Sequence, residues 1–157
     1  MAKRHYIYSL PFSLLITAFK FPKPFKMNKP SNIVFLHLFM ILPCIVLGTY
    51  LIFAKKGSSI HKLAGKIYML LMAFTGILTL FIPAQLGQRI LNHFGVLHLL
   101  SLLTIWTVPK AWFAIKRGDI KTHKAAMIKL YIGGIIIAGG FAILAKGRYL
   151  HNFFFNQ

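Results

Sequence analysis

The stretch LHLFMILPCIVLGTYLIFAKKGSSIHKLAGKIY, residues 36–68, returns later in the chain as LHLLSLLTIWTVPKAWFAIKRGDIKTHKAAMIKLY, residues 97–131. Each copy has a histidine between leucines, an apolar run, two basic residues before a glycine, a histidine followed by lysine, and a tyrosine. The two histidines are 24 residues apart in the first copy (His37 and His61) and 25 apart in the second (His98 and His123). The shared order and spacing indicate a duplicated helical hairpin.

The composition is that of a membrane protein. Hydrophobic residues make up 57% of the chain, and the only acidic residue is Asp119. Crossing a bilayer core takes about 20 apolar residues, and four stretches are long enough, at about 33–54, 63–85, 90–115 and 125–144. Short connections make sequential helices antiparallel neighbours. The sequence therefore predicts an all-α, integral membrane, four-helix up-down bundle built from two tandem helical-hairpin repeats.

The predicted transmembrane domain covers residues 32–150, between a basic N-terminal tail, residues 1–31, and a short C-terminal tail, residues 151–157. The apolar part of the N-terminal tail is too short to span a bilayer comfortably. We therefore interpret it as an interfacial segment, or as sequence before a true start at Met27, with residues 1–26 not translated. We favour the second interpretation.

The formal charge of +18 is high enough to raise the question of a nucleic-acid partner. The basic residues stand at the ends of the predicted helices, where lysine and arginine anchor to lipid headgroups. We therefore expect membrane lipids and no nucleic acid as partners, with Lys62, Lys124, Arg117 and Arg148 as candidate headgroup-binding residues. Ten basic residues lie at the two hairpin loops and four, leaving out the N-terminal tail, at the opposite side. The positive-inside rule then places both basic loops in the cytoplasm and both termini outside.

The duplicated histidines carry the chemical prediction. Because the helices alternate in direction, His37 and His98 share one depth in the bundle, and His61 and His123 share another. A quasi-two-fold bundle would turn each pair inward. Two neutral imidazoles on opposite faces of a flat ring are the ligands of a b-type haem. Zinc or copper usually takes more ligands, and no carboxylate or cysteine is placed to complete a set. All four histidines are therefore candidate iron ligands for one or two haem b groups.

The structural alternatives remain open at this point. His37 and His98 could hydrogen-bond between helices, and His61 and His123 could cap their helices or bind lipid phosphate. Asp119 is expected to cap the helix that follows it. The chain contains no phosphate-binding loop, dinucleotide fingerprint, zinc-protease motif or nucleophile elbow. No catalytic residue is therefore assigned, and whether the chain is an enzyme is left open.

Several of these residues also resemble a known family. They are Lys56-Gly57, His61-Lys62, Gly65, Tyr68, Gly95, His98, Arg117-Gly118-Asp119, His123, Met127, Tyr131 and Gly147-Arg148. Together they are similar to a bacterial four-helix membrane family of the domain of unknown function 2306 type, over roughly residues 32–150. The resemblance implies a bacterial cytoplasmic membrane location and no established activity. The architecture is also similar to that of cytochrome b561, by analogy alone.

Two hypotheses follow. In the first, the chain is a small b-type haem electron-transfer protein that exchanges electrons with a quinol or a redox partner protein. In the second, it is a non-enzymatic membrane accessory or assembly subunit, with histidines in structural helix contacts and basic loops that bind anionic lipid or an acidic partner. Oligomerisation is left open in both.

Overall fold

The computed structural model describes residues 31–84, 93–145 and 149–155. The first three long helices are α2 (Asn32–Phe53), α3 (Ser59–Leu80) and α4 (Val96–Lys116). The last long helix has three segments, α5 (Ile120–Leu130), the π-helix η1 (Tyr131–Ile137) and α6 (Ala138–Leu144), and the short helix α7 (Tyr149–Phe155) follows. These four long helices are long and apolar enough to cross a membrane. The predicted all-α membrane bundle is confirmed.

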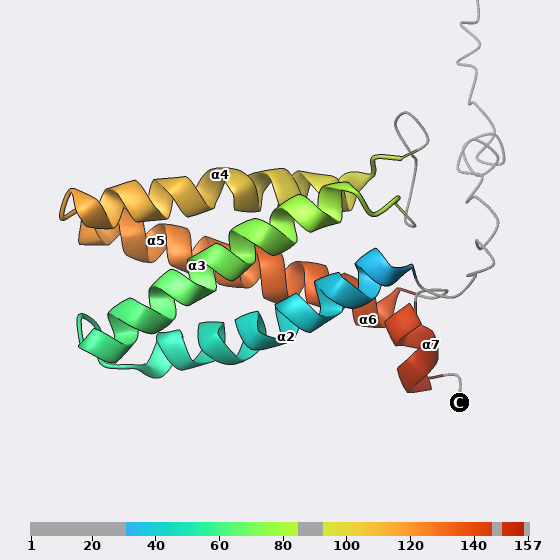
Figure 1. Cartoon of the computed structure of the whole chain (residues 1–157), viewed down its shortest axis with the longest axis horizontal. Coiled ribbons are helices and arrows are strands. Elements are labelled where there is room, and N and C mark those ends of the chain that lie inside the picture. The colour runs from blue at the N-terminus through green and yellow to red at the C-terminus, as the bar shows by residue number, and fades with distance from the viewer. Residues whose placement is uncertain (1–30, 85–92, 146–148, 156–157) are drawn as a thin grey trace, which may run out of the picture.

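The helices form two hairpins, α2–α3 and α4–α5, whose connecting loops lie at the same end of the molecule (Figure 1). Helix α3 packs against both α2 and α4, helix α5 packs against α4, and η1 reaches α2 as well as α4. The order around the bundle is therefore α2, α3, α4 and the last helix. This order places α2 diagonally opposite α4, as the repeat leads one to expect.

The outer surface of the bundle is apolar on every long helix. Phe39 and Val46 on α2 are each 69% exposed, Leu70 on α3 is 71% exposed and Trp106 on α4 is 75% exposed. An aqueous protein rarely exposes apolar surface on this scale. In a bilayer these side chains contact lipid. The surface that would be unfavourable in water therefore anchors the protein in the membrane.

Two clusters of buried side chains form the interior. Cys44, Tyr68 and Met72 are the largest side chains that are almost fully buried, and they join α2 and α3 to the last helix through Leu130 and Ile135. A second cluster joins α3, α4 and α5 through Met69, Ala111 and Ala126. Small residues at these contacts let the helix backbones approach closely, which is how helices associate without a hydrophobic driving force between them.

Two helices begin earlier than the hydropathy pattern predicts. Helix α3 begins at Ser59 rather than at residue 63, and α5 begins at Ile120 rather than at residue 125. Both first turns are polar, and a capping residue rather than hydrophobicity fixes where each helix starts. Helix α4 begins later than predicted, at Val96 rather than at residue 90, because the chain is still extended at Gly95.

Gly48 is the closest approach of α2 to the last helix. A Cβ atom at Gly48 would lie 2.7 Å from Cδ2 of Tyr131 and 3.0 Å from Cε2 of Tyr68. The Tyr131 ring cannot easily move aside, because its hydroxyl is hydrogen-bonded to Thr49 Oγ1 at 2.9 Å. The absence of a side chain at Gly48 is therefore what allows the two hairpins to meet here.

We expect Gly48→Ala to destabilise the bundle by about 1–3 kcal/mol, because overpacking a fixed contact costs this much. The matched control is Gly133→Ala, since no heavy atom lies within 4 Å of a Cβ built at Gly133. The measurement is the SDS concentration at which half of the helical circular-dichroism signal is lost. Equal midpoints for the two variants would contradict the packing argument.

Candidate functional site

The two hairpin loops are built alike. Gly57 and Gly118 both have a positive φ, 81° and 76°, a conformation that favours glycine. The next residue caps the following helix in each copy. Ser58 Oγ accepts the His61 N–H at 3.1 Å, and Asp119 Oδ1 accepts the Thr122 N–H at 2.9 Å. The duplication seen in the sequence is therefore also a duplication of turn geometry, and the predicted Asp119 cap is confirmed.

These caps place His61 and His123 in the first turns of α3 and α5, at the end of the bundle where both loops lie (Figure 1). We call them the loop-side pair. His61 is close enough to His123, and also to Lys56, to interact electrostatically with both. Both rings are half-buried. These two histidines are therefore within electrostatic reach of each other, and their joint ligation of one iron stays a prediction.

Hydrogen bonds decide which ring nitrogen of His123 is free. His123 Nδ1 lies 2.9 Å from the carbonyl oxygen of Ala111. A carbonyl can only accept, so Nδ1 carries the proton and Nε2 keeps its lone pair in the neutral ring. Histidines that bind metals are commonly held in this way, by a backbone carbonyl on the other nitrogen. His61 Nδ1 is buried and has no hydrogen-bond partner among the described residues.

His37 and His98, which we call the far-side pair, lie at the other end of the bundle. His98 is only 7% exposed. The backbone N–H of His98 donates to the Gly95 carbonyl at 2.9 Å. The ring Nδ1 of His98 accepts the backbone N–H of Gly95 at 3.1 Å. This is the side-chain half of a capping box, and glycine has no side chain to supply the other half. His98 Nε2 is buried without a partner among the described residues.

His37 is half-buried on α2 and interacts with other residues. Its helix packs mainly on α3 and η1, whereas the helix of His98 packs mainly on α3, α5 and η1. The far-side histidines thus stand on diagonal helices. Their joint ligation of one iron stays a prediction.

A row of hydroxyl side chains between α3 and α4 was not predicted as a feature. Ser101, Thr104 and Thr107 follow His98 at intervals of three residues on the buried face of α4. Ser101 Oγ and Thr79 Oγ1 lie 2.7 Å apart, and Thr79 also bonds the Gly76 carbonyl at 2.8 Å. The spacing of three residues in the sequence is the signal from which this row could have been predicted. The Ser101 and Thr104 hydroxyls bond Thr79 or the backbone, so we interpret the row as a helix contact.

The two histidine pairs differ in how well they fit haem. In the loop-side pair, His123 already has a free lone pair at Nε2 and a carbonyl that holds the ring. In the far-side pair, His98 has its lone pair at Nδ1, already used by Gly95. A bare metal ion fits less well, because no group of three or more histidine, cysteine or acidic side chains comes together within the described ranges. The loop-side pair is therefore the better candidate site.

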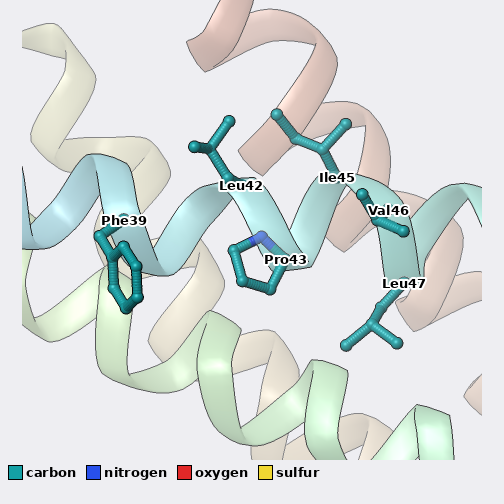
Figure 2. Close-up of a pocket in the computed structure, with 6 residues that line it drawn as sticks. All are labelled: Phe39, Leu42, Pro43, Ile45, Val46 and Leu47. Carbon is teal, nitrogen blue, oxygen red and sulfur yellow. The ribbon is translucent and has the colours of Figure 1, made fainter.

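The groove shown in Figure 2 is a different kind of feature. It lies along the outer face of α2 around Pro43, and every side chain that lines it is apolar. The lining residues are Phe39, Leu42, Pro43, Ile45, Val46 and Leu47. None of the candidate histidines contributes to it. The groove faces lipid and offers no polar group with which a cofactor could be held.

Basic side chains surround the loop-side pair. Lys62, Lys124 and Arg117 are exposed, in keeping with their predicted contact with headgroups, whereas Arg148 lies outside the described residues. Lys56 Nζ donates to the carbonyl oxygens of Leu51 and Ile52 at 2.6 and 2.7 Å and so satisfies the last turn of α2. This end of the bundle therefore presents a strongly positive surface at the level of the lipid headgroups.

Asp119, the only acid, is held by Thr122. Hydrogen bonds from the side chain and backbone of Thr122 lower the pKa of the Asp119 carboxyl below its ordinary value. A depressed pKa stabilises the fold above the unfolded-state pKa, and this contribution is lost as the pH falls through the folded-state pKa. The positive end of the dipole of α5 also stabilises the ionised Asp119 carboxylate.

We therefore expect the wild type to melt at a higher temperature than Asp119→Asn at neutral pH, because asparagine keeps the cap and removes the charge. The gap should close once the pH falls below the lowered pKa of Asp119. Melting curves from pH 3 to pH 7 test this. A gap that persisted in acid would show that charge is not the cause.

Comparison with known proteins identifies a family. The family model described as "Predicted membrane protein (DUF2306)" matches residues 33–152, which is 120 of the 157 residues. No curated protein and no solved structure matches the chain. The family description agrees with the membrane bundle and is silent on activity, and the analogy with cytochrome b561 gains no support from these comparisons.

Proposed function

This chain belongs to the DUF2306 family of predicted membrane proteins, and we propose that it is a membrane electron-transfer protein that holds b-type haem between histidines of its two repeats. We place it in the bacterial cytoplasmic membrane with both basic loops in the cytoplasm. Its electron donor would be a quinol or a redox partner protein. The observation that supports the proposal is the loop-side pair, since His61 and His123 stand in the corresponding first turns of α3 and α5 at the same end of the bundle.

The residues of the chain have separate roles in this proposal. His61 and His123 would hold the haem iron. The Ala111 carbonyl fixes the His123 ring, and a hydrogen bond of this kind on the other ring nitrogen also raises the basicity of a ligand. The exposed Lys62 and Lys124, each next to a ligand in sequence, would hold carboxylate or phosphate groups at the membrane surface. When bound, haem supplies a one-electron carrier that no side chain of this protein can replace.

We expect the purified protein, expressed with added haem precursor, to give a sharp low-spin α-band in a dithionite-reduced minus oxidised spectrum. His61→Ala and His123→Ala should each remove the band, because one imidazole cannot keep iron low-spin and six-coordinate. His151→Ala is the matched control, since His151 lies on α7 and its Nδ1 bonds the Ile143 carbonyl. A folded wild type without haem would refute the proposal.

A second candidate function rests on the same hydrogen bonds. His98 and His123 both bond to backbone groups, which is what histidines do when they only stabilise helix ends and contacts. The chain would then be an accessory or assembly subunit, and the basic loops would bind anionic lipid. Each basic residue near the surface of an anionic membrane contributes about 1 kcal/mol to such binding.

We expect the Lys62→Gln/Arg117→Gln/Lys124→Gln variant to lose at least tenfold of its preference for phosphatidylglycerol over phosphatidylcholine. The preference is measured as lipid retained through detergent purification from mixed vesicles. The matched control is Lys56→Gln, because the Lys56 ammonium already donates to carbonyl oxygens in the last turn of α2. Unchanged retention in the triple variant would remove the basic loops as the lipid site.

A further inference from the structure

We propose that the chain holds haem at one depth only, at the loop-side pair, and that His98 is the positioning residue that caps α4. This inference rests on the proposed haem function. It departs from the expectation of one or two haem groups with all four duplicated histidines as candidate ligands. The departure comes from hydrogen bonds at His98 that the sequence repeat does not reveal.

The direction of one hydrogen bond fixes the proton on His98. The group facing His98 Nδ1 at 3.1 Å is the backbone N–H of Gly95, which can only donate. Nδ1 therefore uses its lone pair to accept, and the neutral ring carries its proton on Nε2. Iron needs the lone pair of an unprotonated nitrogen. Ligation through Nε2 would require the ring to be fully deprotonated or to abandon Gly95.

The surroundings of His98 oppose such a rearrangement. Its ring packs edge-on against Phe94 at 5.1 Å between centroids and lies 5.6 Å from the ring of His93. The nearby hydroxyls of Thr79 and Ser101 are already bonded to each other. Releasing Gly95 would also leave its part-buried backbone N–H, at the start of α4, without this partner.

His123 shows the opposite arrangement. There the partner of Nδ1 is the carbonyl oxygen of Ala111, an acceptor, so the free lone pair is on Nε2. The two histidines of the second copy, His98 and His123, therefore have opposite tautomers. The duplicated motif supplies two histidines in each copy. The backbone group that faces Nδ1 of a histidine then decides whether its Nε2 is free to bind iron.

A single haem level has a functional consequence. His61 and His98 lie in the first turns of α3 and α4, at opposite ends of the bundle. At 1.5 Å per residue, the levels of the two pairs are roughly 25–30 Å apart. A chain with haem at the loop side alone would accept and deliver electrons at that face, and would not carry them across the membrane by itself.

The test compares wild type, His98→Gln and His98→Ala, all expressed with added haem precursor. Glutamine at this position can accept the Gly95 N–H, as in a capping box, and cannot serve as a strong iron ligand. The readouts are haem per chain, by pyridine haemochrome assay, and the melting temperature. We expect one haem per chain in all three proteins. The melting temperature should be unchanged in His98→Gln and lower by about 2–4 °C in His98→Ala, because a helix cap contributes about 1 kcal/mol.

Other results would overturn the inference. Two haems per wild-type chain, or loss of haem from His98→Gln, would make His98 a ligand. An unchanged melting temperature in His98→Ala would refute the capping role. If the wild type binds no haem, the proposed function fails, while the melting temperatures still decide whether His98 caps α4. The wild-type stoichiometry and His98→Ala keep the inference falsifiable even if His98→Gln does not fold.

Discussion

The structure depends on one constraint: the hydrocarbon core of a membrane contains no water to satisfy a polar group. Backbone groups there must pair within the chain, which is why the spanning segments are helices. The same constraint acts on side chains. Thr75 and Thr104 turn their hydroxyls back to the Met72 and Leu100 carbonyls, and Ser101 pairs with Thr79. A histidine placed among such residues is controlled by whichever backbone group it meets.

The repeat explains why part of this arrangement was predictable. Two glycines with positive φ, each followed by a capping residue, turn both hairpins in the same way, and the sequence shows both. Hydropathy locates the four spans because length and apolar content suffice for that. Hydropathy does not locate the first turns of α3 and α5. Their polar residues lie at the membrane surface, where a cap rather than hydrophobicity decides the helix start.

Other features could not be predicted because they depend on contacts between distant residues. The tautomer of His98 follows from the conformation of Gly95, and that of His123 follows from a carbonyl on a neighbouring helix. The π-helix η1 is another example. It begins at Tyr131, which follows His123 by eight residues, whereas Tyr68 follows His61 by seven, and its glycine Gly134 lies against Met72. Sequence reveals the extra residue and leaves open how the helix absorbs it.

The duplication repeats the hairpin, while His98 and His123 each have their own hydrogen-bonded partner. Two copies of one motif give four histidines at two depths, and the repeat pairs His37 with His98 and His61 with His123. The two depths differ in their hydrogen bonds, since a donor meets His98 and an acceptor meets His123. At the far side the histidine is used to begin a helix, because its ring accepts the Gly95 N–H. At the loop side, close to the lipid headgroups and the positive loops, the ring retains a lone pair that a ligand can use.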